Sequence, residues 1–186
     1  MPIKKTIATL LALAVTGAAA FAQAETPPDP VTITLAAGSA QNTIRIWLTP
    51  DGYSYVIDSA GPLEVGGTIC KHPVDNTNEL ICEAPAIAGF VVNCGSHDDS
   101  IVVSRAVKVP VTLHGAAGRD TLLGGGGNDM IVGGPGSDRL GGRGGDDVVY
   151  GGPGGDLIKG GAGNDTLRGG PGRDEVLGGS GSNTVS

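Results

Sequence analysis

The sequence predicts an all-β protein in which a small strand-rich region precedes a coil of short repeats. Glycine supplies 34 of the 186 residues and the aromatic residues number only six, which argues against a conventional large core. From residue 115 to residue 186 a glycine-rich motif recurs every nine residues. After residue 24, the chain carries no apolar stripe with the spacing of a helix.

The first 24 residues have the features of a secretory signal peptide. Two lysines precede a 16-residue run of apolar and small residues, which ends at the small-residue cleavage site Ala22-Gln23-Ala24. The run is shorter than the roughly 20 residues that a helix needs to cross a bilayer. We therefore expect cleavage after Ala24, export to the extracellular space or the periplasm, an extended linker over residues 25–30, and no membrane span in the mature chain.

The chain is acidic, and its charge restricts the partners that it can bind. Its formal net charge is -7, and removal of the two leader lysines leaves 10 basic against 19 acidic residues. Nucleic acids and anionic lipids need a basic surface. The composition therefore excludes nucleic acid as a main partner and favours cations.

Residues 31–114 are expected to form strands. Runs that alternate β-branched or aromatic residues with polar ones are separated by Gly, Pro, Asn and Asp, at residues 31–35, 44–48, 53–57 and 109–113. Residues 94–101 look like a degenerate copy of the later repeat, because Asp98 and Asp99 precede Ile101 at the repeat spacing. We therefore expect the coil to begin before residue 115.

Three cysteines lie in this strand-rich region, and three cannot pair completely. An oxidising compartment favours a disulfide. The turn-forming residues 73–78 would bring Cys70 against Cys82, and we favour this bridge over one between Cys82 and Cys94. A metal site formed by Cys94 and His97 is a weaker alternative, because two ligands three residues apart carry little specificity.

Eight blocks of nine residues fill residues 115–186. Glycine dominates the first, second and fourth positions of the blocks. The sixth position holds, in order, Asp120, Asp129, Asp138, Asp147, Asp156, Asp165, Asp174 and Asn183. The eighth position holds Leu122, Ile131, Leu140, Val149, Ile158, Leu167, Val176 and Val185. A flexible linker would not keep an acidic column and an aliphatic column in the same period, so the blocks are expected to stack.

The residue types in each block suit Ca²⁺. Glycine allows the positive φ angles that turn the carbonyls of a tight loop towards one point, and a carboxylate follows directly. The last three residues of the block then form a short strand with one buried aliphatic side chain. Flexible sets of hard oxygen ligands favour Ca²⁺ over a transition metal, which prefers His or Cys, and the repeats contain neither.

Two blocks are expected to make one coil of 18 residues, which stacks equivalent residues at roughly 4.8 Å. One column then contains Asp120, Asp138, Asp156 and Asp174, and the other contains Asp129, Asp147, Asp165 and Asn183. Neighbouring carboxylates repel by roughly 1 kcal/mol in water and by several at an effective dielectric constant of about 20. The coil should therefore form only when cations lie between the carboxylates.

The blocks resemble the nonapeptide of the repeats-in-toxin (RTX, hemolysin-type) calcium-binding family, Gly-Gly-x-Gly-x-Asp-x-aliphatic-x. The resemblance covers 72 residues, with clean copies at residues 133–140 and 160–167. It implies a right-handed parallel β-roll with Ca²⁺ held between each loop and the loop two blocks further on. Carried over, it pairs Asp120 with Asp138, Asp129 with Asp147, Asp138 with Asp156, Asp147 with Asp165, and Asp156 with Asp174.

Some positions depart from the family pattern. Ala116 and Arg143 replace the second glycine of the first and fourth blocks, where strain or weaker binding is expected. In the fourth block Asp146 would be the ligand in an alternative register, whereas Asp147 keeps the nine-residue step and is preferred. Asn183 has no charge, so its pair with Asp165 should bind Ca²⁺ weakly.

The sequence gives no sign of catalysis. Its three histidines are scattered, and the common nucleophile, zinc and phosphate-binding motifs are missing. We expect a secreted, non-enzymatic protein whose repeats fold on binding extracellular Ca²⁺. The alternative is a structural or adhesive protein in which Ca²⁺ only rigidifies the coil while residues 31–114 bind a partner. The last coil, which ends at Ser186 without a cap, favours end-to-end association.

Overall fold

The computed structural model describes residues 31–36, 41–52, 54–59, 70–71, 79–83 and 87–186. These residues form strands and turns, and none of them lies in a helix. No helix of this described part could therefore cross a membrane. The expected signal peptide at residues 1–24 and the linker at 25–30 lie outside the described residues.

The strands form two sheets. The seven-stranded sheet has the order β1-β6-β8-β10-β12-β14-β16, with bounds Val31–Ala36, Ile87–Asn93, Val111–His114, Met130–Val132, Val148–Tyr150, Thr166–Arg168 and Thr184–Val185. The nine-stranded sheet has the order β15-β13-β11-β9-β7-β2-β3-β5-β4. Its bounds, in the same order, are Glu175–Ser180, Leu157–Ala162, Arg139–Gly144, Thr121–Leu123, Ser100–Val103, Thr43–Leu48, Ser54–Ser59, Glu79–Glu83 and Cys70–Lys71.

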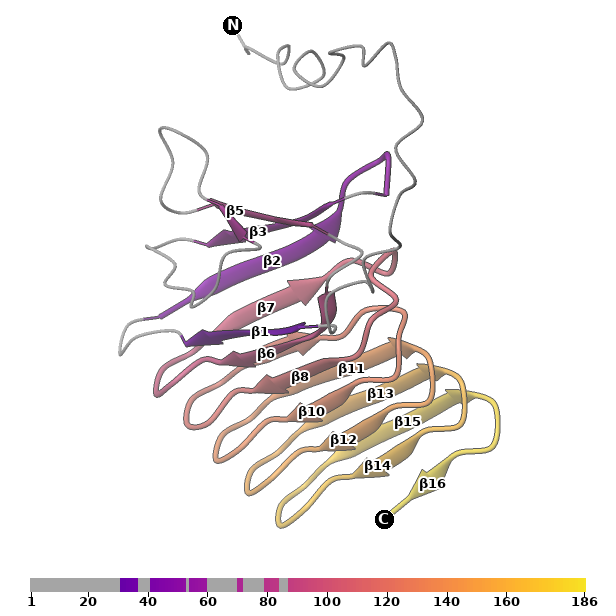
Figure 1. Ribbon diagram of the computed structural model, residues 1–186. Helices are drawn as coiled ribbons and strands as arrows, with labels where there is room; N and C mark the ends of the chain where they lie inside the picture. The colour runs from indigo at the N-terminus through magenta and orange to yellow at the C-terminus, as the bar shows by residue number, and fades with distance from the viewer. Residues whose placement is uncertain (1–30, 37–40, 53, 60–69, 72–78, 84–86) are drawn as a thin grey trace, which may run out of the picture.

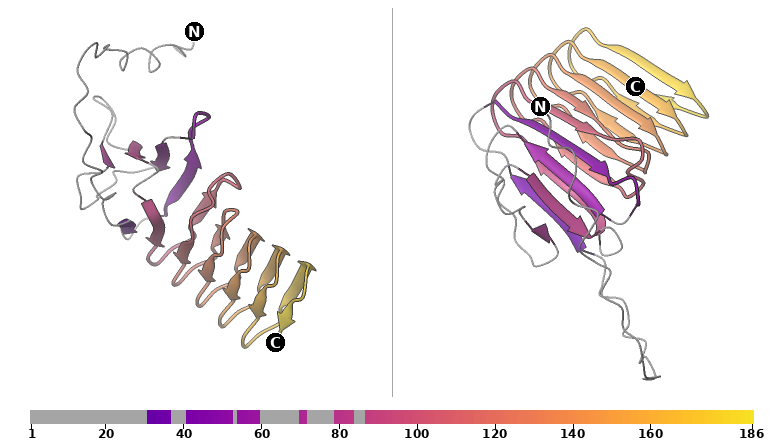
Figure 2. Two further views of the ribbon diagram at one scale, coloured as in Figure 1. Left: turned by 45° about the vertical axis from the view of Figure 1, so that its right-hand side comes forward. Right: turned by 90° about the horizontal axis from the view of Figure 1, so that it is seen from above.

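From β6 to β16 the chain alternates between the two sheets and so winds as a coil (Figure 1). Within the repeats each strand pairs in parallel with the strand one coil later, 18 residues further on, as Leu122 with Leu140 and Ile131 with Val149. Figure 2 shows these coils stacked one after another along a single axis, with the C-terminus in the last coil. The predicted all-β fold, a parallel β-roll with two blocks in each coil, is confirmed.

Strands in the nine-stranded sheet are longer than the sequence predicts. The repeat positions predict three-residue strands, yet β11, β13 and β15 each span six residues. Their second halves belong to the glycine loops, where Arg143 pairs with Gly161 and Gly144 pairs with Ala162. Because the loops of successive coils have the same shape, their backbones come into register and extend the sheet.

The strands predicted before the repeats are largely observed, with shifted ends. The runs at 31–35, 44–48 and 53–57 correspond to β1, β2 and β3, although residue 53 lies outside the described residues. The run at 109–113 begins as a strand only at Val111, since Pro110 has no N–H to donate. The Pro110 carbonyl instead accepts a hydrogen bond from Phe90 N at 3.1 Å.

Strand β6 was not predicted from the sequence. Its run contains Gly89, which reads as a break in a strand. The reason for this glycine is a close approach of the backbone, because a Cβ atom at Gly89 would lie only 2.6 Å from the Pro110 carbonyl oxygen. Strand β7, which follows residues 94–99, pairs in parallel with β9 in the way that successive repeat strands do.

An antiparallel set of strands closes the amino-terminal end of the larger sheet. Strands β2, β3, β5 and β4 are paired antiparallel in this order. The register sets Cys70 opposite Cys82, Cys82 is disulfide-bonded, and Cys94 is a free thiol. Of the two pairings considered, these observations support Cys70 with Cys82 and rule out Cys82 with Cys94. The turn-forming residues 73–78 that favour this bridge lie outside the described residues.

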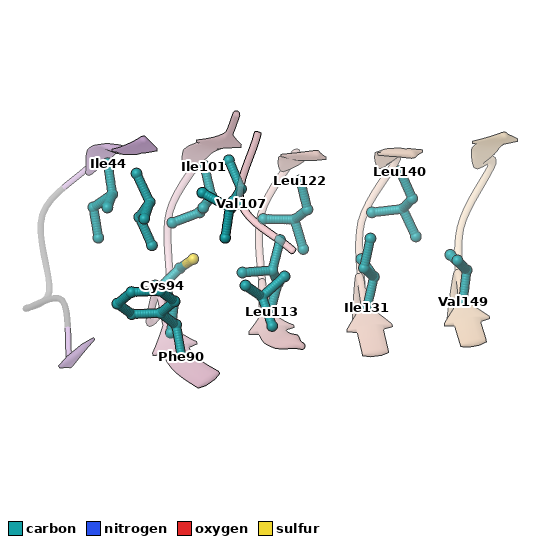
Figure 3. Packing of buried hydrophobic residues seen from close by; sticks show 14 of the residues in the cluster. Ile44, Phe90, Cys94, Ile101, Val107, Leu113, Leu122, Ile131, Leu140 and Val149 are labelled. Carbon is teal, nitrogen blue, oxygen red and sulfur yellow. The ribbon is translucent and has the colours of Figure 1, made fainter. Parts of the chain in front are cut away.

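One narrow core runs through all the coils. Residues from the two sheets meet in it, with Ile44, Ile101, Leu122 and Leu140 facing Phe90, Leu113, Ile131 and Val149 (Figure 3). The predicted aliphatic column is buried from Leu122 to Leu167, and exposure rises only in the last coil, where Val185 is 52% exposed. Each of the first seven blocks thus contributes one side chain to the core or packs one against it.

Candidate metal centre

The repeat aspartates form two hydrogen-bonded columns inside the loops. In one column the backbone N–H of each aspartate donates to Oδ1 of the next, at 2.8 Å from Asp120 to Asp138, 2.8 Å from Asp138 to Asp156 and 2.9 Å from Asp156 to Asp174. In the other column the distances are 2.8 Å from Asp129 to Asp147, 3.0 Å from Asp147 to Asp165 and 2.8 Å from Asp165 to Asn183. The two columns expected from the 18-residue coil are therefore present.

In most of these columns' aspartates the second carboxylate oxygen is buried without a partner. The oxygens concerned are Oδ2 of Asp99, Asp120, Asp138, Asp147, Asp156 and Asp165. A buried polar atom without a hydrogen bond costs roughly 1–3 kcal/mol, and a charged one costs more. A row of such oxygens indicates a ligand that binds them.

Backbone carbonyls lie beside these oxygens. At Gly133, a Cβ atom would lie 2.4 Å from Asp138 Oδ2 and 2.6 Å from the carbonyl oxygen of Gly151. The first glycines of three other blocks show the same pattern, with both oxygens within 2.6 Å of one point, at Gly115, Gly151 and Gly160. Each such point thus brings together a carboxylate from one loop and a carbonyl from the loop one coil later.

The electrostatics of the columns disfavour negative charge. Burial, together with the charges of neighbouring carboxylates, raises the pKa of Asp147 to about 7 and that of Asp138 to about 6. Burial also raises the pKa values of Asp120 and Asp156. In each case a backbone N–H that donates to the carboxylate acts in the opposite direction. A bound cation would remove the repulsion between the carboxylates and keep them ionised.

The donor set fits Ca²⁺. Among the described residues, no three His, Cys, Asp or Glu side chains gather closely enough to hold a metal ion. A metal between two loops would therefore take two carboxylates from side chains and the rest of its ligands from backbone carbonyls or water. Ca²⁺ accepts such oxygen sets, whereas zinc and other transition metals prefer His or Cys.

The two neighbouring aspartates of the fourth block have different environments. Asp147 is buried in the column. Asp146 is exposed and belongs to an outer ladder, in which its N–H donates to Asn128 Oδ1 at 2.9 Å and its Oδ1 accepts from Asn164 N at 2.7 Å. The preferred nine-residue register, with Asp147 in the column, is therefore the observed one.

The last residue of the second column, Asn183, differs from the aspartates before it. Asn183 uses its one side-chain oxygen to accept the hydrogen bond from Asp165 N, and its amide Nδ2 donates to Gly179 O at 3.4 Å. At Gly178, this nitrogen takes the position that Oδ2 holds beside the other first glycines. A donor group therefore stands where a cation would need an acceptor.

Asp99 extends the first column into the degenerate coil. Its N–H donates to Asp120 Oδ1 at 2.8 Å, and its own Oδ1 accepts from Asn42 N at 2.6 Å. The sequence indicates the acidic pair in this coil but does not place Asp99 among the site residues, and the step from Asp99 to Asp120 is 21 residues instead of 18. The signal that identifies it is Ile101, which follows two residues later and is buried.

Both substitutions of a second glycine lie in the unfavourable backbone region. Ala116 has φ 70° and Arg143 has φ 79°, the only non-glycine residues with positive φ in the described chain. The strain expected at these two positions is thus observed. Each residue keeps the conformation that glycine adopts at the same position in other blocks, for example at Gly134 with φ 110°.

Cys94 is poorly suited to bind a metal with His97. Burial, together with the charges of Asp99 and Asp120, raises the pKa of its thiol to about 12. Metal ligation by cysteine requires the thiolate. His97, in contrast, is exposed.

Comparison with known proteins agrees with this geometry. The profile of the RTX calcium-binding nonapeptide repeat family matches residues 112–140, 131–158 and 150–185, in four copies. No curated protein and no solved structure matches the chain significantly. The matched ranges begin at β8 and cover all the coils that carry the two aspartate columns. Residues 112–185 are therefore a region of RTX calcium-binding nonapeptide repeats.

Proposed function

We propose that this chain is a secreted, non-enzymatic protein whose repeat region folds when it binds extracellular Ca²⁺. The observation that carries the proposal is the row of buried, unpartnered Oδ2 atoms, of which those of Asp120, Asp138, Asp156 and Asp165 lie beside a glycine carbonyl of the next coil. The ions would lie between successive coils, where they would join oxygens from two loops and offset the repulsion between carboxylates. The ligand aspartates would be Asp120, Asp129, Asp138, Asp147, Asp156, Asp165 and Asp174.

An open groove of about 580 Å³ follows the first column and would allow ions to enter. Its lining includes Asp120, Asp138, Asp156 and Asp174. Extracellular Ca²⁺ is close to millimolar, so sites with dissociation constants of roughly 10⁻⁴–10⁻³ M would be filled there and left empty in the cytosol. Folding would then be coupled to arrival outside the cell, in agreement with the expected leader at residues 1–24.

Isothermal titration calorimetry of the chain with Ca²⁺ tests this proposal. The variant Asp138→Asn/Asp156→Asn removes two adjacent carboxylates of the first column, so we expect it to lose that column's binding and to keep the binding of the second column. Asp51→Asn, an exposed change outside the repeats, serves as the control and should titrate like the wild type. No binding of millimolar Ca²⁺ by the wild type, or unchanged binding by the double variant, would refute the proposal.

A further inference from the structure

The loop at residues 124–129 differs from the other loops of the roll. Of the seven aspartates buried in the described part of the chain, only Asp129 has a partner for both carboxylate oxygens. Its Oδ1 accepts from Val111 N at 3.0 Å and its Oδ2 accepts from Gly125 N at 2.7 Å. Gly125 also lacks the positive φ found at the second position of the other seven blocks. By sequence this loop is a regular copy of the motif, so the cause lies in its neighbours.

The coil before this loop has no aspartate to share an ion. Val111 occupies the equivalent place, because its N–H donates to Asp129 Oδ1 as the N–H of Asp120 donates to Asp138 in the first column. In the first column, the carbonyl of a first glycine lies near an Oδ2 atom of the coil before it. The Gly124 carbonyl lacks such a carboxylate, so a Ca²⁺ ion at this place would bind weakly.

Arg143 places its own positive charge there. Its Nη1 donates to Gly124 O at 3.2 Å and to Val103 O. Val103 ends β7 and Gly124 follows β9, so the guanidinium bridges two neighbouring strands of one sheet. To place this charge, residue 143 adopts a φ of 79° that glycine would adopt without strain.

An insertion covers the same loop from the other side. Ile101 and Leu113 are 12 residues apart, whereas Leu113 and Leu122 are nine apart. The extra residues place Val107, which is fully buried, so that its carbonyl accepts from Gly126 N at 2.8 Å. Backbone and side-chain contacts of this kind hold the loop without help from an ion.

We propose that Arg143 is a built-in cation that takes the place of Ca²⁺ at the amino-terminal end of the Asp129 column. It holds the loop at residues 124–129 in its folded form without a bound ion. The inference rests on the proposed function for the remainder of that column, Asp147 and Asp165. It follows that the first coils are ordered before Ca²⁺ arrives and form the surface on which the calcium-dependent coils assemble.

Hydrogen exchange of the full chain, followed by mass spectrometry in excess chelator and in saturating Ca²⁺, tests this inference. In chelator, we expect peptides that contain residues 124–129 of the wild type to exchange slowly. Arg143→Gly should raise their exchange rate at least tenfold in chelator and restore slow exchange in Ca²⁺. Ala116→Gly is the matched control, since it removes a positive-φ residue at the equivalent position of the first block but no charge. It should not raise the exchange rate of residues 124–129.

Three results would overturn the role of Arg143. One is wild-type exchange of residues 124–129 that is as fast in chelator as in an unfolded chain. Another is an Arg143→Gly variant with wild-type exchange in chelator. The last is a variant that Ca²⁺ does not restore, or that also loses protection in β6, since the arginine would then serve the fold as a whole. The proposed function is judged separately from wild-type peptides covering residues 151–156, which must gain protection on addition of Ca²⁺.

Discussion

Four repeat aspartates, Asp120, Asp138, Asp156 and Asp165, use their two carboxylate oxygens in two different ways. Oδ1 continues the column, as when Asp156 Oδ1 accepts the N–H of Asp138 at 2.8 Å. Oδ2 faces the glycine carbonyl of the next coil and has no partner in the protein. An asparagine can perform the first task but not the second, as Asn183 demonstrates by turning its Nδ2 to the place of Oδ2.

This division predicts different effects for two adjacent substitutions. Asp147→Asn should remove the Ca²⁺ bound on either side of residue 147, because its column hydrogen bond survives while its ion-facing oxygen is lost. Asp146→Asn should leave Ca²⁺ binding unchanged, because Asp146 lies in the exposed outer ladder. Equilibrium dialysis against radioactive calcium measures both stoichiometries. A larger loss in Asp146→Asn than in Asp147→Asn would assign the ligand to the alternative register.

Backbone strain at Ala116 predicts that a glycine there stabilises the roll. The residue is exposed and has φ 70°, so Ala116→Gly should raise the free energy of unfolding by about 1 kcal/mol. Ala162→Gly, also exposed but without positive φ, should instead lower it by roughly 0.5–1 kcal/mol. Denaturant unfolding at a fixed Ca²⁺ concentration compares the two. Equal effects of the same sign would show that Ala116 carries no strain.

The raised pKa values predict that acid partly replaces Ca²⁺. Asp138 and Asp147 have pKa values of about 6 and about 7 in the folded chain, above the ordinary value of 3.8. Between the ordinary pKa of 3.8 and these raised pKa values, the folded form binds more protons than the unfolded form. The stability of the metal-free roll therefore falls as the pH rises from about 4 to about 7. The far-ultraviolet circular dichroism of metal-free protein should therefore show more β-structure at pH 5 than at pH 8. An increase in β-structure with rising pH would contradict the electrostatic account.

At the scale of the element, each repeat strand from β9 to β14 contributes one side chain to a narrow core. Ile158 of β13 is fully buried, whereas Leu177 of the neighbouring β15 is 46% exposed. Ile158→Ala should therefore destabilise the Ca²⁺-loaded chain by about 2–5 kcal/mol and Leu177→Ala by less than about 0.5 kcal/mol. Denaturant unfolding in saturating Ca²⁺ measures both. Similar costs for the two changes would show that the column does not form the core.

The repeat elements could be predicted from the sequence because period and chemistry agree in every block. The aspartate at the sixth position and the aliphatic residue at the eighth fix where each loop ends and which side chain enters the core. Strands β6 and β7 and the role of Asp99 were harder, because the coil that contains them has 21 residues. There Pro110, Gly89 and the insertion around Val107 adjust the backbone through contacts that are distant in sequence.

The two aspartate columns of the candidate site could be predicted from the sequence, but the different loop at residues 124–129 could not. Nothing in the glycine-rich sequence of residues 124–129 shows that its loop is folded differently or that Arg143 reaches the Gly124 carbonyl. Those features depend on what the preceding coil supplies, namely Val111 instead of an aspartate. A motif describes one block, whereas each metal position is built from two.

At the scale of the whole molecule, the two ends of the roll differ. The amino-terminal end is closed by the antiparallel strands β2–β5 and by the disulfide of Cys82. The last coil leaves Val185 52% and Leu177 46% exposed. With the ion-independent loop at residues 124–129, this asymmetry predicts that order extends from the amino-terminal coils towards β16 as Ca²⁺ binds.

The central claim is that the stacked carboxylates require divalent ions for the repeat coils to form. Circular dichroism of the chain, recorded while Ca²⁺ is titrated into a solution that starts in excess chelator, tests it most directly, with Mg²⁺ as the control ion. We expect a large gain in β signal with Ca²⁺ and little or none with Mg²⁺, which demands a more rigid octahedral ligand set. A β signal in chelator as strong as that in Ca²⁺ would contradict the claim.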